Sequence, residues 1–158
     1  MDAAAFAPFG TVVEAGGAFE LINDGTTRRY PDRAALDVLG AGRDPVLGLY
    51  VTQARRFPLA ISRLERHAEA AQAFLPLGAH RFVVVVAPGD AHGPRWDAVE
   101  AFATAPEQGV VLRRGCWHHG LVALGDGDRF AVIEGGNYRG DTREVPAPFA
   151  IELSAPLA

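Results

Sequence analysis

Short stretches of β-type sequence separated by turn signals are the feature that most constrains the fold of this chain. No apolar run exceeds six residues, and the longest is Phe82–Ala87. Runs of this length suit strands better than helices. The 18 glycines and 11 prolines also fit a turn-rich β fold better than a helix bundle. The predicted strands are residues 10–14, 47–52, 59–67, 82–87, 109–113, 121–124, 129–133 and 149–153.

Turn signals connect these strands, with room for only one or two short helices. Residues 125–128, Gly-Asp-Gly-Asp, predict a hairpin, and the Asn-Asp-Gly of residues 23–25 predicts another turn. Val99 and Phe102 lie three residues apart and indicate a helix over residues 96–102, while the Ala-rich residues 68–73 suit a helical turn. We therefore expect a single, mainly β domain over residues 1–158, built as a small barrel or sandwich.

Charge and composition exclude several classes of protein. The net charge is −4 without a basic run, so neither nucleic acid nor an anionic membrane surface is an expected partner. All 15 basic residues are Arg, which excludes Schiff-base chemistry on a lysine and leaves anion recognition to guanidinium groups. The single cysteine, Cys116, excludes an intrachain disulfide framework, and the first residues lack the basic region of a signal peptide. A cytoplasmic protein is therefore expected.

A split set of polar side chains is the best candidate for a functional site. The first part is Glu65-x-His67-x4-Gln72, and the second is Gly115-x-x-His118 about fifty residues later. Residues two apart on a strand point to the same face, so Glu65 and His67 are expected to face one interior. A carboxylate, two imidazoles and an amide oxygen in one cavity would suit a divalent first-row metal.

Each of the first three residues also has a structural interpretation. Glu65 and His67 could form an ion pair with Arg63 or Arg66 at the rim of the fold. Gln72 could satisfy backbone groups near a turn. These alternatives need no metal and remain open at the level of sequence.

The second segment, residues 115–119, also has both ligand and structural interpretations. His118 and His119 are adjacent and must face opposite ways on a strand, so only one of them readily enters an interior. The spacing from Gly115 favours His118 as the ligand and leaves His119 for a structural, interface or substrate-binding role. Trp117 is expected to pack in the core, and Cys116 to be a small apolar filler rather than a nucleophile.

Motifs spread over nearly the whole chain carry a further indication. They are Phe6-x-x-Phe9-Gly10, Ile22-Asn23-x-Gly25 with Arg29-Tyr30, Leu64-Glu65-Arg66-His67, Gln72–Pro76, Val84–Ala87, Glu107–Val110, Trp117-His118-His119 and Gly135-Gly136. Together they resemble the landmarks of the ureidoglycolate lyase family, cupin-like enzymes of the allantoin branch of purine breakdown. The chain departs from the family pattern at Asp24, where a second Asn is common, and at Gly120, where Pro is common. Neither position is a candidate ligand.

The resemblance implies a cupin-like antiparallel β-barrel of the jelly-roll type, commonly a homodimer. It implies a carbon–nitrogen lyase that cleaves a small anionic substrate, ureidoglycolate, to glyoxylate and urea. A divalent metal, nickel in particular, is associated with some members, and no organic cofactor is expected. On this basis the predicted metal ligands are Glu65, His67, Gln72 and His118, the predicted catalytic residues are Glu65, His67 and His118, and the predicted substrate-binding residues are Arg29, Tyr30, Gln72 and His119.

Two other functions remain open. A metal-dependent cupin oxygenase also needs two or three histidines and a carboxylate with free positions for oxygen, and Glu65, His67 and His118 meet that count. A non-catalytic small-molecule-binding barrel is the third hypothesis. The absence of a DNA-binding segment from the sequence weakens a regulatory role for such a barrel.

Overall fold

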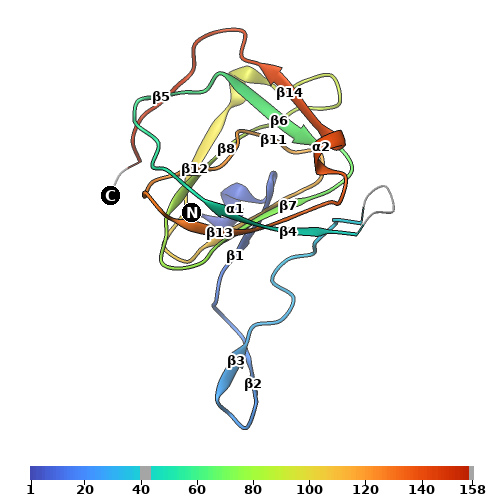
Figure 1. The fold of residues 1–158 in the computed structure, drawn as a ribbon, viewed down its shortest axis with the longest axis vertical. Helices are drawn as coiled ribbons and strands as arrows, with labels where there is room; N and C mark the ends of the chain where they lie inside the picture. The colour runs from blue at the N-terminus through green and yellow to red at the C-terminus, as the bar shows by residue number, and fades with distance from the viewer. Residues whose placement is uncertain (40–43, 157–158) are drawn as a thin grey trace.

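Two antiparallel sheets pack face to face in the computed structural model, which describes residues 1–39 and 44–156 (Figure 1). The prediction of a mainly β, antiparallel fold is confirmed, although the sheets form an open sandwich rather than a closed barrel. The first sheet has the order β1 (Gly10–Val13), β10 (Gly109–Leu112), β7 (Gln72–Pro76), β13 (Arg129–Glu134) and β4 (Val46–Val51). The second contains β12 (Val122–Ala123), β8 (Phe82–Ala87), β11 (Trp117–His118), β6 (Arg63–His67) and β14 (Thr142–Pro146), with β9 (Glu100–Ala103) paired to β8.

Small elements complete the fold, and the two short helices agree with the prediction in number, although neither lies at a predicted position. The β2–β3 hairpin projects away from the sandwich (Figure 1). No helix in the described ranges is long and apolar enough to span a membrane. The small elements are α1 (Ala3–Phe6), α2 (Tyr138–Asp141), the 3₁₀ turn η2 (Trp96–Ala98), the hairpin of β2 (Glu20–Ile22) and β3 (Thr27–Arg29), and the pair of β5 (Leu59–Ala60) and β15 (Glu152–Leu153).

The core has two layers because β8 is buried on both faces. Val84 and Val86 join a cluster between the sheets that includes Phe74 and Phe130. Alternate residues of β8 face the other way, into a second cluster around Trp117. Burial of each large apolar side chain contributes roughly 1.5–3 kcal/mol, so these clusters dominate the stability of the sandwich. The expectation that Trp117 packs in the core is confirmed.

The predicted strand over residues 59–67 is interrupted, and this changes which side chains share a face. β5 ends at Ala60 and β6 begins at Arg63. Because of the break, Ile61 packs with Leu64 in the cluster around Trp117. The expected single face running from Leu59 to His67 was therefore wrong. The alternation within β6 still gives Glu65 and His67 a common face, and that face is the one between the sheets.

The predicted helix over residues 96–102 was also wrong. Only Trp96–Ala98 form a 3₁₀ turn, and residues 100–103 form β9 against β8. Pairing with a buried valine strand supplies both hydrogen bonds and apolar contacts, and these outweigh the weak helical spacing. Residues 68–69 form a bend rather than a helical turn, residues 70–71 have no regular structure, and residues 72–73 already belong to β7.

Candidate metal and substrate site

Strands β6 and β11 bring three predicted ligands together between the sheets. His118 lies directly opposite Glu65 in the β11–β6 pairing, and His67 follows two residues along β6. The candidate ligand atoms of Glu65, His67 and His118 all lie within 4.8 Å of one another, and the two imidazole centroids are 5.4 Å apart. Both histidines are buried. This grouping, called the ligand cluster below, has the donor types that divalent first-row metals prefer, and it could hold such an ion.

The turn before β11 fixes the position of His118. Gly115 has a φ of +79°, a left-handed conformation that favours glycine. Its N–H donates to the carbonyl of His67 at 2.7 Å, which ties the turn to the end of β6. The Gly115-x-x-His118 spacing therefore has a physical basis: the glycine makes the turn, and the turn delivers the histidine to the cluster.

Gln72 reaches the ligand cluster from the opposite sheet. Its Oε1 lies 3.1 Å from Nε2 of His118. Its Nε2 donates to Oε1 of Glu134 at 2.5 Å, and the Tyr50 hydroxyl donates to the same oxygen at 3.3 Å. Because a carboxylate only accepts, Glu134 holds the amide of Gln72 with its oxygen toward His118. All four predicted ligands thus lie in one place.

Hydrogen bonds at the far side of each imidazole determine which nitrogen is free. Nδ1 of His118 lies 3.0 Å from the carbonyl of Cys116, so this nitrogen carries a proton and donates. Nδ1 of His67 lies 3.2 Å from Oγ1 of Thr142, whose own proton is donated to the carbonyl of Tyr138 at 2.6 Å. The threonine oxygen must therefore accept from His67. In the neutral form of each ring, Nε2 is therefore the unprotonated nitrogen, and it faces the cluster.

The unprotonated nitrogens leave a surplus of acceptors in a buried space. Nε2 of His118 faces Oε1 of Gln72 at 3.1 Å and Oε1 of Glu65 at 3.4 Å. Nε2 of His67 is buried and has no hydrogen-bond partner among the residues that the structure describes. Electron-rich atoms placed this way need a cation, either a proton or a metal ion, among them. The residues present therefore fit a divalent metal.

Electrostatics of the ligand cluster agree with this arrangement. Burial opposes ionisation of Glu65, but a proton held between its carboxylate and Nε2 of His118, together with the neighbouring imidazoles, keeps the pKa of the carboxyl below its usual value. Burial, and then the positive charge that His118 carries when it is protonated, lowers the pKa of His67. An ionised carboxylate and a neutral imidazole are the forms that bind metal.

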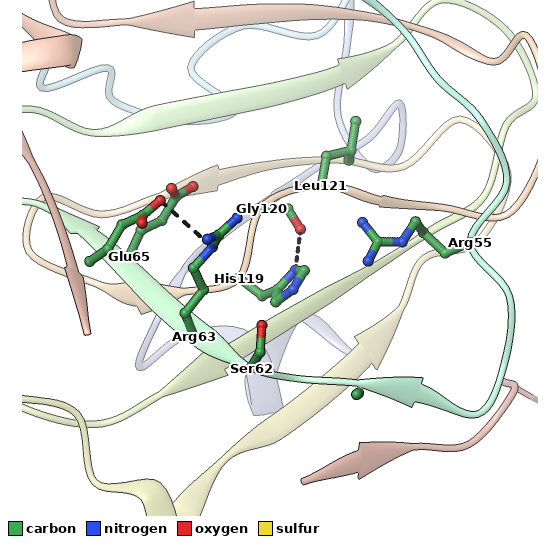
Figure 2. A pocket seen from close by; sticks show the side chains of 9 residues that line it. Arg55, Ser62, Arg63, Glu65, His119, Gly120 and Leu121 are labelled. Carbon is green, nitrogen blue, oxygen red and sulfur yellow. Dashed lines mark hydrogen bonds and ion pairs between the residues drawn. The ribbon is translucent and has the colours of Figure 1, made fainter. Parts of the chain in front are cut away.

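A cavity of about 250 Å³ opens beside the ligand cluster, and Glu65 belongs to both (Figure 2). His119 also lines this cavity, whereas the adjacent His118 belongs to the ligand cluster. Nδ1 of His119 lies 2.8 Å from the carbonyl of Gly120 and therefore donates. Burial, followed by the charges of Arg55 and Arg63, lowers the pKa of His119 despite the opposing effects of Gly120 and Glu65.

Arg29 and Tyr30, predicted to bind substrate, lie elsewhere in the subunit. Arg29 ends β3 and pairs with Glu20 at 3.4 Å, and Tyr30 follows it at the base of the projecting hairpin. Neither residue lines the cavity beside Glu65. The structure does not bring them to the ligand cluster.

The alternative of a rim ion pair finds no support in the contacts of the two arginines. Arg63 pairs with Glu144 at 3.8 Å, and Arg66 donates to the carbonyl of Asp90 and lies over the ring of Trp117. The ion-pair partner of Glu65 is His118.

Sequence reasoning missed Glu134 and Thr142, which orient two of the predicted ligands. A signal for Glu134 was available: Phe130, Val132 and Glu134 alternate along β13, and all three are buried. A carboxylate at the third position of an inward apolar face needs a polar partner, which here is Gln72. Thr142 gives no comparable signal, because it is the pairing of β14 with β6 that places it opposite His67.

Comparison with known proteins identifies the family of this chain. The family model for ureidoglycolate lyase matches residues 1–153. A ureidoglycolate lyase of Burkholderia mallei (strain NCTC 10229) is 44% identical over 153 residues, covering 96% of this chain and 88% of the relative. One from Azotobacter vinelandii is 43% identical over 136 residues, covering 85% and 81%, and one from Pseudomonas aeruginosa is 41% identical over 132 residues, covering 82% and 77%. The chain belongs to the ureidoglycolate lyase family.

Proposed function

We propose that this protein is a carbon–nitrogen lyase that cleaves ureidoglycolate to glyoxylate and urea. The observation that carries the proposal is the cluster of the partly buried Glu65 with the buried His67 and His118. The Glu65 carboxylate also lines a cavity of small-metabolite size. Family membership supplies the substrate class, since the relatives are named ureidoglycolate lyase.

The reaction is an elimination that needs no oxidant or added water. Ureidoglycolate carries a hydroxyl, a carboxylate and a ureido group on one carbon. Loss of the hydroxyl proton allows a C=O bond to form as the C–N bond breaks, and the urea nitrogen takes up a proton. Positioned acid and base groups typically accelerate such proton transfers by roughly 10²–10⁴-fold.

Glu65, His67, Gln72 and His118 are the proposed ligands of a divalent metal, for which the family resemblance favours nickel. When bound, such an ion would act as a Lewis acid and lower the pKa of the substrate hydroxyl. The protein's part is to hold both Nε2 atoms unprotonated through the bonds to Thr142 and to the carbonyl of Cys116.

Residues at the boundary of the cluster and the cavity would handle the substrate. Glu65 reaches both spaces, so its carboxylate is placed to exchange a proton with a substrate in the cavity. The ring of His119 has its Nδ1 proton engaged by Gly120, which leaves Nε2 to accept a hydrogen bond from the substrate hydroxyl.

A coupled assay tests the proposal. Purified protein would be analysed for bound metal and supplied with ureidoglycolate, and urea and glyoxylate would be measured together. Equimolar release of both products supports the lyase. Absence of urea from metal-replete protein would overturn it and favour a non-catalytic binding role.

One observation favours a second candidate. Two histidines and one carboxylate, as in the ligand cluster, are also the ligand set of non-haem iron oxygenases. Anaerobic turnover separates the two functions, because the elimination consumes no oxygen. Urea release at an unchanged rate without oxygen supports the lyase, whereas a requirement for oxygen supports the oxygenase.

We also propose a cytoplasmic homodimer, held through the exposed face of β4. Leu47, Leu49 and Val51 alternate on this edge strand of the five-stranded sheet and are 69%, 73% and 72% exposed. An apolar stripe on a sheet edge is a site for association. Light scattering should give twice the 16.8 kDa subunit mass.

A matched pair of variants tests this face. Leu49→Glu should convert the dimer to a monomer, whereas Leu77→Glu, an exposed leucine outside β4, should not. A wild-type monomer would contradict the proposed assembly.

A dimer also offers the only route by which the predicted substrate-binding residues Arg29 and Tyr30 could take part, since their hairpin would have to reach the cavity of another copy.

A further inference from the structure

The cavity beside Glu65 carries two arginines that the reaction chemistry above leaves without a role. Arg55 lies on the segment between β4 and β5, and Arg63 begins β6. Figure 2 shows their side chains approaching the space around His119 from opposite sides. The segment before β5 and the start of β6 thus place two guanidinium groups at one small cavity.

Neither guanidinium is committed to a strong partner among the described residues. Arg63 makes a single ion pair with Glu144, with a long separation of 3.8 Å between Nε and Oε1, and both side chains are half exposed or more. The hydrogen bond of Arg55 to the carbonyl of Ala123, at 3.0 Å, is made by the backbone N–H and not by the guanidinium. Exposed ion pairs of this kind contribute little, so a bound anion can replace them readily.

We propose that Arg55 and Arg63 together bind the carboxylate of the substrate and orient its reacting carbon toward Glu65. This inference rests on the proposed function, because it assigns the recognition residues of the same site. A guanidinium presents a planar fork that matches a carboxylate, and two forks flanking one cavity can hold a carboxylate in a defined direction.

The size and charge of the cavity support a small 2-hydroxy carboxylate as the ligand. Its volume of about 250 Å³ is just below the roughly 300–1,000 Å³ typical of pockets for drug-sized ligands. Two arginines lie opposite two glutamates, Glu65 and Glu144, and the metal proposed at the ligand cluster would neutralise Glu65. The cavity therefore favours a single negative charge and disfavours the neutral amide of the same acid.

Arginine variants test the assignment. Arg55→Met and Arg63→Met should each raise KM for ureidoglycolate by about 10- to 100-fold, the range expected for losing a charge-assisted hydrogen bond. The effect on kcat should be smaller, and Arg63→Lys should recover part of the loss. Arg95→Met is the matched control, since Arg95 is exposed, pairs with Asp97 and lies outside the cavity. Metal content should be unchanged in every variant.

A binding measurement separates this inference from the proposed function. Glycolate, a 2-hydroxy carboxylate without a ureido group, would be titrated calorimetrically into metal-replete wild type and each variant. Binding by wild type and Arg95→Met with at least tenfold weaker binding by Arg55→Met and Arg63→Met supports the carboxylate site, even if no urea is released. Equal glycolate affinity in all proteins, no binding by wild type, or KM values within twofold of wild type in both Met variants would each overturn it.

Discussion

Gln72 and Glu134 form a side-chain pair across β7 and β13, with Nε2 of the glutamine donating to Oε1 of the glutamate at 2.5 Å. Both residues are buried. The pair decides which end of the Gln72 amide faces His118, and an inverted amide would direct N–H donors at the ligand cluster instead of an oxygen. The orientation of a predicted ligand therefore depends on a residue that is itself outside the cluster.

Glu134→Gln should weaken metal binding by about 10- to 100-fold, as expected for loss of a partner that orients a ligand. A glutamine at this position can donate as well as accept, so Gln72 becomes free to invert. Metal affinity would be measured by competition with a chelator. Glu100→Gln, on the exposed edge strand β9, is the control. An unchanged affinity in Glu134→Gln would show that the amide orientation is set elsewhere.

His67→Ala and His118→Ala should each lower urea release by roughly 10²-fold or more, because each removes a proposed ligand and an acid–base group. Bound metal should fall in parallel. His92→Ala, at an exposed position outside the cluster, should match wild type. Circular dichroism would establish that the variants are folded. Folded variants with normal rates would refute the proposed site.

Thr142→Val should reduce metal affinity by about tenfold or more, since it removes the oxygen that accepts from Nδ1 of His67 while keeping the side-chain shape. Thr142→Ser retains the hydroxyl and should behave like wild type. If valine and serine gave equal affinities, the hydrogen bond would have no part in fixing the tautomer of His67.

Cys116→Ala should leave the rate of urea release nearly unchanged. The Cys116 side chain is buried in the core between the sheets, and burial raises the pKa of its thiol to about 12. His118 binds the backbone carbonyl of this residue, which the substitution retains. The native protein should also react slowly with thiol reagents. Rapid labelling, or a large loss of activity in Cys116→Ala, would contradict this.

Acid should destabilise the metal-free protein below about pH 6.5, the unperturbed pKa of histidine. The pKa of His67 is lowered by burial, so the unfolded chain takes up this proton before the folded protein does. The free energy of unfolding should then fall as the pH drops, by up to about 1.4 kcal/mol per pH unit for this group. Urea denaturation of chelated protein at several pH values measures the slope. His67→Ala should show a shallower slope than wild type between pH 6.5 and 5; an equal slope would exclude His67 as the source.

Strands with an uninterrupted or regular pattern were predictable from sequence, and those defined by tertiary pairing were not. β8 follows directly from a run of six apolar residues, and it is buried on both faces. β14 has no such pattern, since it is an edge strand with mostly exposed residues, and it becomes visible only through its pairing with β6. The break at residues 61–62 was hard to predict because no glycine or proline lies within residues 59–67 to mark it.

The candidate site also has parts that were predictable from sequence and parts that were not. The two-residue spacing of Glu65 and His67 gives their common face, and Gly115 anticipates the turn that delivers His118. Arg55 lies on an irregular segment, so its approach to Arg63 is a property of the folded chain alone.

The four proposed ligands come from both layers of the sandwich. Glu65, His67 and His118 belong to one sheet, whereas Gln72, held by Glu134, belongs to the other. An ion bound by all four residues would be a cross-link, and the rate at which the layers separate would depend on how long the ion stays. Metal-free protein should therefore exchange the amide protons of β6 and β7 faster than the loaded form. The lifetime of the bound ion would then set the rate of local opening. Loss of the ion would expose β6 and β7 to proteases before any global unfolding.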